Sequence, residues 1–339
     1  MAKQPDPPQP DLPPIPRRAL LAGPLLLATA GARAEEAYPA GPVTLVAPFA
    51  TGGAADLAAR TLAAFAPRHL PNRNASIRVE NRVGASGAIG TLSVARAKPD
   101  GATLLLARVA PCAILPAIDS RTPYAWDGFT VLGLLDETPF VLCVRADAPW
   151  RNVGELLSAL RERLGRLAFG TTGPATLPDL GVRALFIAAG LPFDAAVAQP
   201  HAGGGAAVAA LVAGEVQFLG GNLSELSGSI GTGTLRPLLV GGRQRLRGLP
   251  DVPSAGEEGF ELLVPITGWN ALYGPPGLPE PVVAAWGGVL RDLAKDGGWL
   301  AATRRAGALP RLLGPEETRD FVRDQAAVYR DLAKRMGLV

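Results

Sequence analysis

Short apolar runs alternate with helix-like stretches along the first part of the chain. Val43–Pro48 is an apolar, β-branched run that ends in proline, and such runs are typical of buried parallel strands. Ala54–Ala66 instead repeats its large apolar residues near helical spacing. The alternation continues with strands expected at 76–81 and 102–107 and a helix at 91–97. This order predicts right-handed crossovers and a parallel sheet with helices on both faces.

A second unit of the same kind begins after the apolar run Phe140–Val144. Its expected helices alternate with short apolar strands, which again indicates a parallel sheet. The expected helices are 153–164, 179–189 and 205–213, and the expected strands are 167–170, 196–199, 216–219 and 235–240.

The end of the chain completes the predicted architecture. After Trp269–Tyr273 come three helical stretches, at 282–295, 299–306 and 315–336. We predict an α/β fold of two lobes, each a mainly parallel sheet flanked by helices, with the chain crossing between lobes at Phe140–Val144 and Trp269–Tyr273. The predicted division is lobe 1 at 35–140 and 269–339, and lobe 2 at 141–268.

Residues 1–34 differ in character from the rest. A proline-rich start is followed by Arg17 and Arg18 and then by the apolar run Ala19–Ala32. With small residues at its end, this is the pattern of a secretory signal peptide cleaved after Ala34, and it predicts a periplasmic protein. The alternative is an amphipathic helix or a short anchor, although the run is short for a membrane span. The arginine pair permits twin-arginine export, and the general secretory route stays open.

Composition narrows the classes of partner and cofactor. Apolar residues make up 48% and charged residues 19% of the chain, which is a globular balance despite 41 glycines and 33 prolines. The 33 Lys and Arg against 30 Asp and Glu leave a net charge of only +3, without the basic clusters of a nucleic-acid binder. Two Cys and two His are too few for a usual zinc cage. We therefore expect no metal, no cofactor and no nucleic-acid partner.

The sequence offers little for catalysis. The two histidines, His69 and His201, lie in no nucleophile motif. The G-x-x-G-x-x-G run at 84–90 lacks the start of a dinucleotide fingerprint and favours a tight turn. Cys112 and Cys143 could pair in an oxidising compartment or remain two buried thiols, since a sequence does not show their separation.

Two similar loops are present, one in each unit. PFATGG at 48–53 and FGTTGPAT at 169–176 each follow a strand and open a helix. Helix N-termini carry unpaired N–H groups that bind anions, glycine lets an anion approach the backbone, and threonine adds hydroxyl donors. Both loops lie at the carboxyl ends of their strands, where open α/β sheets bind ligands. They are expected to hold a small carboxylate across a cleft, the alternative being two well-capped helix starts.

Several segments resemble one known family and occur in its order. They are PFATGGAADLAAR (48–60), VENRVGASGAIGT (79–91), AKPDGATLLLA (97–107) and, after LRPLLVGGRQR, DVPSAGEEGF (251–260). Through them the chain from 38 to 339 resembles the Bug family, the extracytoplasmic solute receptors of tripartite tricarboxylate transporters. The resemblance implies a two-lobed periplasmic-binding-protein (Venus flytrap) fold that closes on its ligand by hinge motion. It also implies that a carboxylate binds between 49–53 and 171–176, partly through ordered waters.

The sequence departs from the family pattern at places that bear on ligand choice. Arg108 follows the ATLLLA strand, where the family usually has a short polar stretch. Pro174 and Ala175 interrupt the second loop, and Gln217 stands where an Asp is common, shortly before Asn222. The site for one carboxylate is kept, and the part that sets specificity is altered.

Two side chains receive specific roles. Asp56 is expected to accept a hydrogen bond from a ligand hydroxyl or amine, or else only to complement the helix dipole. Arg108 is expected to grip a second carboxylate, which favours a dicarboxylate, or else to face solvent or to pair with Asp136 or Glu137. The expected ligand-binding residues are Phe49, Ala50, Thr51, Gly52, Gly53, Asp56, Arg108, Thr171, Thr172, Gly173, Thr176 and Asn222.

The resemblance implies a monomeric periplasmic solute-binding protein. It would capture a small organic carboxylate and deliver it to the membrane subunits of a tripartite tricarboxylate-type transporter. One alternative is a periplasmic carboxylate sensor that signals to a membrane partner. The other is an enzyme on the same fold with Asp56 or Asp179 as a base, which the lack of a cofactor motif and of a positioned histidine disfavours.

Overall fold

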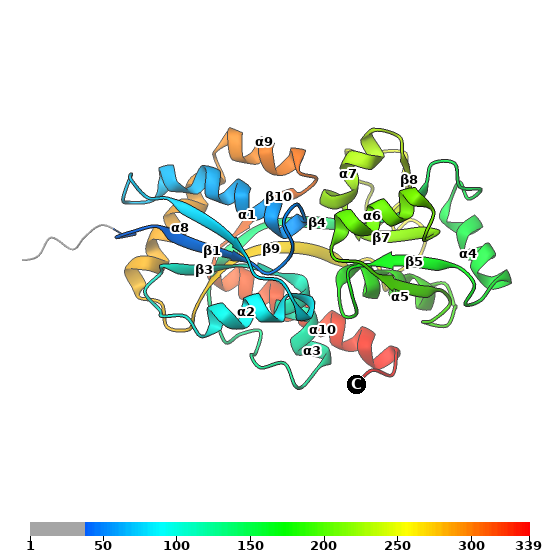
Figure 1. The fold of residues 1–339 in the computed structure, drawn as a ribbon, viewed down its shortest axis with the longest axis horizontal. Coiled ribbons are helices and arrows are strands. Elements are labelled where there is room, and N and C mark those ends of the chain that lie inside the picture. The colour runs from blue at the N-terminus through cyan, green and yellow to red at the C-terminus, as the bar shows by residue number, and fades with distance from the viewer. Residues whose placement is uncertain (1–37) are drawn as a thin grey trace, which may run out of the picture. The chain divides into compact units, whose positions relative to one another are not determined.

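The computed structural model describes residues 38–339 (Figure 1). The predicted signal peptide, with its cleavage after Ala34, lies outside the described residues. Within residues 38–339 we find no helix that combines the length and the apolar character of a membrane span.

One end of the molecule contains the first predicted unit. Strand β1 (Val43–Ala47) pairs in parallel with β2 (Ile77–Asn81) and β3 (Thr103–Arg108), as the alternating pattern predicted. Helix α1 starts where Gly53 ends the loop after β1, and its alanine-rich face is buried. The elements are β1 (Val43–Ala47), α1 (Ala54–Phe65), β2 (Ile77–Asn81), α2 (Ala88–Ala95), β3 (Thr103–Arg108) and α3 (Leu115–Ile118), with a one-turn π-helix before α3.

The other end contains the second predicted unit. Strand β5 (Ala168–Thr171) pairs in parallel with β6 (Val197–Pro200) and β7 (Phe218–Asn222). The elements are α4 (Val153–Glu162), β5 (Ala168–Thr171), α5 (Leu177–Ala188), β6 (Val197–Pro200), α6 (Gly204–Ala213), β7 (Phe218–Asn222), α7 (Leu223–Gly231) and β8 (Leu235–Val240).

Two long antiparallel strands join these ends. Strand β4 (Thr130–Arg145) pairs with β9 (Thr267–Gly274) along its first part and with β7 and β8 from Phe140 onward. The strand order is β2-β1-β3-β9-β4-β7-β5-β6, and Figure 1 shows β4 and β9 running through the middle of the molecule. The chain ends in α8 (Glu280–Leu293), α9 (Gly297–Arg305), β10 (Leu309–Leu313) and α10 (Pro315–Arg335), and β10 pairs with β4.

The structure differs from the predicted elements most clearly at β4, β10 and α7. The sequence predicted a strand only at Phe140–Val144, whereas β4 begins at Thr130. Its first part was missed because Gly133 and Pro139 interrupt the apolar run and because its pairing with β9 is broken by bulges. Strand β10 contains a proline and helix α7 is rich in Ser and Gly, so neither had a clear local signal.

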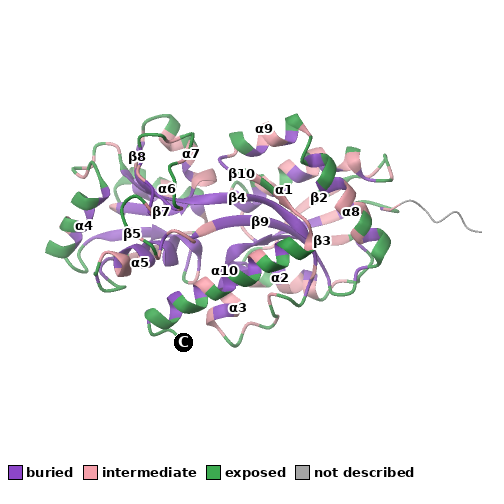
Figure 2. Ribbon diagram, turned by 180° about the vertical axis from the view of Figure 1, so that it is seen from behind, coloured by how far each residue is buried: buried purple, intermediate pink, exposed green. Residues whose placement is uncertain are grey.

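The hydrophobic core lies along the strands of the sheet. Figure 2 shows buried residues along the central strands and exposed residues on the outer sides of the helices. Cys112 and Cys143 are both buried and free, and they belong to separate apolar clusters. Burial raises the pKa of Cys112 to about 12 and that of Cys143 further still. The two thiols are therefore unpaired core residues.

Candidate functional site

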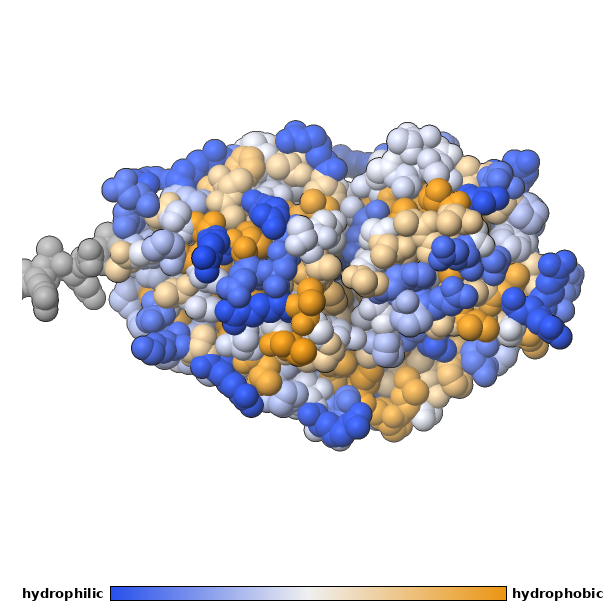
Figure 3. Space-filling view, viewed as in Figure 1, coloured by the Kyte–Doolittle hydropathy of each residue, from blue (hydrophilic) through white to orange (hydrophobic). Residues whose placement is uncertain are grey.

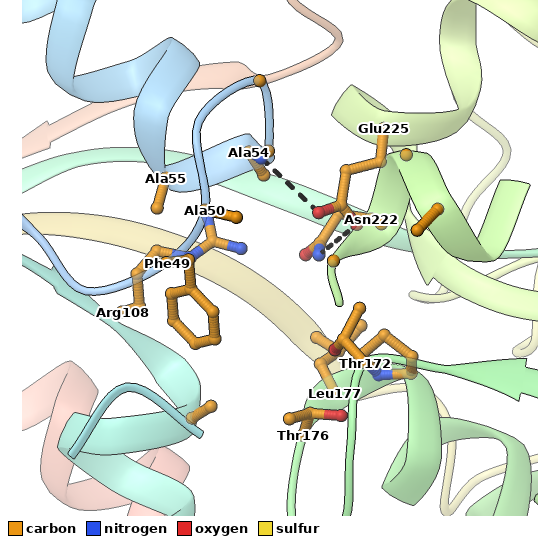
Figure 4. A pocket seen from close by; sticks show the side chains of 18 of the residues that line it. Phe49, Ala50, Ala54, Ala55, Arg108, Thr172, Thr176, Leu177, Asn222 and Glu225 are labelled. Atoms are coloured by element: carbon orange, nitrogen blue, oxygen red, sulfur yellow. Dashed lines mark hydrogen bonds between the residues drawn. The ribbon is translucent and has the colours of Figure 1, made fainter. Parts of the chain in front are cut away.

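A cavity of about 300 Å³ lies where four helices begin, and the surface is hollowed between the two ends of the sheet (Figures 3 and 4). Strand β3 contributes Arg108 at its end, and the N-termini of α1, α5, α6 and α7 contribute the other walls. The lining residues are 49–55, 108–110, 172, 176–178, 202–206, 222 and 225.

Hydrogen bonds with Asn81 hold the first predicted loop in place beside the start of α1. Gly52 has a φ of +81°, a left-handed conformation that favours glycine. The carbonyl of Phe49 accepts a hydrogen bond of 3.0 Å from Asn81 Nδ2, and Thr51 Oγ1 donates to Asn81 Oδ1 at 3.3 Å. The residues of this loop that were predicted to bind a ligand, 49–53, all line the cavity.

Asp56 supports this loop from inside the protein and does not line the cavity. Only 2% of the residue is exposed, and its Oδ2 accepts hydrogen bonds of 2.9 Å from the Gly52 N–H and from Arg60 Nε. Burial by itself would raise the pKa of Asp56, but the hydrogen bonds from Arg60 and Gly52 outweigh it and hold the pKa below its usual range. Asp56 thus fixes the turn before α1.

The second predicted loop is bonded within itself. The hydroxyls of Thr171 and Thr176 both donate to the carbonyl oxygen of Gly173, at 3.1 and 2.7 Å. Thr172 and Thr176 line the cavity, whereas Thr171 and Gly173 do not. Two of the threonine hydroxyls expected to face a ligand are therefore engaged by the loop itself.

Arg108 belongs to a buried polar row across three strands. Its Nη1 donates to Asn270 Oδ1 at 2.8 Å, and Asn270 Nδ2 donates to Asp136 Oδ1 at 2.6 Å. These residues lie directly opposite one another on β3, β9 and β4. Arg108 is only 5% exposed, yet its guanidinium points into the cavity (Figure 4). Of its predicted alternative partners, Asp136 is reached through Asn270, whereas Glu137 pairs with Arg311.

Burial changes the ionisation of this row. It raises the pKa of Asp136 to about 7, even though the hydrogen bond from Asn270 and the charge of Arg108 act in the opposite direction. Burial also lowers the pKa of Arg108, while the nearby Glu225 and Asp136 carboxylates favour its charged form. A guanidinium remains charged despite such a shift, so the cavity contains one buried cation.

Sequence reasoning missed Glu225 and residues 202–206, which include the start of α6. Glu225 lines the cavity from α7, and it lies against Gly204, the first residue of α6. Asn222, which was predicted, also lines the cavity and donates to Glu225 at 3.1 Å. The sequence signals were a glycine run at 203–205 and an Asn-x-x-Glu pattern, but the latter is typical of a local helix cap. Within residues 38–339, no three His, Cys, Asp or Glu side chains form a group that could hold a metal ion.

Comparison with known proteins identifies relatives along most of the chain. The family model described as "Tripartite tricarboxylate transporter family receptor" (TctC) matches residues 59–338. A UPF0065 protein from the tcbD-tcbE intergenic region of Pseudomonas sp. strain P51 is 34% identical over 282 residues, which is 81% of each chain. Protein BugT of Bordetella pertussis is 27% identical over 318 residues, 92% of this chain and 95% of BugT.

Solved structures agree with these relatives. Rpa4515 of Rhodopseudomonas palustris with adipate has a TM-score of 0.82 and 26% identity, and the match covers 88% of this chain and 98% of that one. MatC of the same organism with bound malate has a TM-score of 0.78 and 27% identity, covering 87% and 99%. The predicted α/β periplasmic-binding-protein fold is confirmed, and such neighbours are binding receptors, not enzymes. Since the family model spans most of the chain and Bug proteins are among the relatives, this protein belongs to the Bug-type receptors of the tripartite tricarboxylate transporter family.

Proposed function

We propose that the protein is a periplasmic receptor that captures a small organic carboxylate in this cavity and delivers it to transporter subunits in the membrane. The observation that carries the proposal is the convergence of four helix N-termini around one buried arginine. The first N–H groups of a helix lack partners within the helix and carry partial positive charge. The cavity is thus suited to an anion.

The two predicted lobes support capture by closure. If 35–140 with 269–339 forms lobe 1 and 141–268 forms lobe 2, the cavity has walls from both, since α1 and Arg108 belong to one and α5, α6 and α7 to the other. The sheet continues between them through β4 and β9. Two strands that bend together can act as a hinge, so binding would draw the lobes together.

A dicarboxylate is the favoured ligand class. Arg108 presents a fork that suits one carboxylate, and the first N–H of α1, which here bonds to the Glu225 carboxylate, suits another. The volume of the cavity agrees with this ligand class, because about 300 Å³ accommodates a compact organic acid. Two similar proteins were solved with adipate and malate, which are both dicarboxylates.

Export and the choice of partner complete the proposal. The first 34 residues would direct secretion and be removed after Ala34, which the N-terminal sequence of the exported protein would test. A sensor would use the same cavity and differ only in its membrane partner. Uptake of the bound acid in cells with and without the receptor gene distinguishes delivery from signalling.

A ligand screen tests the binding step. Organic acids, amino acids, sugars, amines and metal ions are compared by their effect on thermal unfolding, because a ligand of the folded state raises stability as its concentration exceeds Kd. Calorimetry on the active compounds should then give one bound carboxylate ligand per chain. Stabilisation by sugars, amines or metals with no response to any carboxylate would refute the proposal.

A further inference from the structure

One carboxylate already lies in the cavity, that of Glu225 in the first turn of α7 (Figure 4). Its Oε1 accepts a hydrogen bond of 3.4 Å from the backbone N–H of Ala54, the first residue of α1. A Cβ placed on Gly204, the first residue of α6, would lie 2.2 Å from the carboxyl carbon of Glu225. The carboxylate therefore lies between the N-termini of α1 and α6, where helix ends attract an anion.

On the side away from Ala54, the Glu225 carboxylate is held by few contacts. Asn222 Nδ2 donates to its Oε2 at 3.1 Å, and Thr138 Oγ1 donates to Asn222 Oδ1 at 2.9 Å. Asn222 and Thr138 are buried, whereas Glu225 is only half-buried. The contact with Ala54 is longer than a usual N–H···O bond, so it is weak. A long side chain held in this way can give up its place to another carboxylate.

Arg108 is a second anchor that no carboxylate contacts directly. Within the described residues its side chain bonds to the neutral Asn270, and its guanidinium points into the cavity (Figure 4). The cavity thus has two places for an anion. The place beside Arg108 is open, and the place between α1 and α6 is filled by Glu225.

We propose that Glu225 is a specificity-determining residue that stands in for the second carboxylate of a ligand, an inference that rests on the proposed function. A monocarboxylate binds beside Arg108 and leaves Glu225 in place. A dicarboxylate has to displace Glu225 from the N–H of Ala54. Two carboxylates do not share that position, because like charges a few ångströms apart repel each other strongly away from bulk water.

The experiment compares acids that differ only in their second carboxylate. Calorimetry measures the affinity of the purified protein for adipate against hexanoate and for succinate against butyrate. The variant is Glu225→Gln, which removes the charge and keeps the shape. Glu215→Gln is the matched control, because Glu215 is exposed at the end of α6, outside the cavity lining, and its loss changes the net charge equally.

The inference expects Glu225→Gln to bind the dicarboxylates about tenfold more tightly or better, since the competing charge-assisted contact is gone. Monocarboxylate affinity should stay within about threefold of the unchanged protein, and the control should alter neither. A second variant, Glu225→Ala, should likewise bind dicarboxylates more tightly and leave monocarboxylate affinity nearly unchanged. Thermal unfolding confirms that each variant is folded.

Three results would overturn the inference. Equal gains for both kinds of acid would indicate general repulsion instead of a shared position. Unchanged dicarboxylate affinity would show that Glu225 does not compete, and weaker dicarboxylate binding would show that it contacts the ligand. Each of these leaves the proposed function intact, whereas failure of the unchanged protein to bind any carboxylate would remove both.

Discussion

The two glycine- and threonine-containing loops resemble each other in sequence but are bonded differently. The loop at 48–53 is held in place by side chains outside it. The Asp56 carboxylate accepts a hydrogen bond from the Gly52 N–H, and the Asn81 amide donates one to the Phe49 carbonyl. The loop at 169–176 is held in place by two of its own threonines, whose hydroxyls donate hydrogen bonds to the Gly173 carbonyl. The first loop therefore presents backbone to the cavity, and the second uses much of its polarity for its own conformation.

This difference shows that similar motifs need not contribute equally to one site. A threonine hydroxyl that satisfies a loop carbonyl has no donor left for a ligand. The buried cation that lines the cavity is Arg108, which ends β3 beside the first loop. The side of the cavity formed by α1 and β3 should therefore dominate ligand affinity.

The largest expected effect is at Arg108. Arg108→Ala should weaken binding of the best dicarboxylate by about 1.5–3 kcal/mol, because a charge-assisted hydrogen bond is lost. Arg108→Lys keeps the charge without the fork and should lose less. Calorimetry on folded protein measures both, and unchanged affinity in Arg108→Ala would place this residue outside the site.

A pH effect should come from Asp136, behind Arg108. Its pKa is raised to about 7 in the folded protein from an ordinary value of 3.8, so the protonated form is favoured by folding. This stabilising contribution is fully present below about pH 4 and is lost as the pH rises through about 7. The melting temperature should therefore fall between about pH 4 and pH 7, and it should fall less in Asp136→Asn. An equal fall of the melting temperature with pH in both proteins would contradict the assignment of this effect to Asp136.

Asp56→Asn tests the support of the first loop. Loss of the charged acceptor for the Gly52 N–H should lower stability by about 1–2 kcal/mol. Affinity should fall for all carboxylates alike, because the α1 donors lose their placement. A selective loss for hydroxylated or amino-bearing acids would show instead that Asp56 contacts the ligand.

The smallest effect is expected in the second loop. Thr176→Val removes the hydrogen bond to Gly173 and the longer contact with the Thr171 hydroxyl, and it should lower stability by about 1 kcal/mol. Ligand affinity should change by less than in Asp56→Asn. Chemical denaturation and calorimetry on the same preparation measure the two quantities, and a large affinity loss with normal stability would reverse the comparison of the loops.

The local pattern of residues was sufficient for much of the fold. The alternation of apolar runs and helical spacing predicted β1, β2, β3, β5 and β8 and the helices that follow the two loops. Because propensity, turn residues and periodicity act over a few residues, such elements can be predicted from one segment at a time. The same local signals placed the backbone at 49–53 beside a cavity.

What the sequence did not determine depends on segments that are far apart. Glu225 lies three residues after a helix cap, where local rules assign it to its own helix, yet it bonds to Ala54, 171 positions away. In the sequence, Arg108 is only the last residue of a strand. Its polar neighbours Asn270 and Asp136 come from β9 and β4, which pair side by side in the folded sheet. The partner of a polar side chain depends on which surfaces the apolar core brings together, and only the packed tertiary structure contains that information.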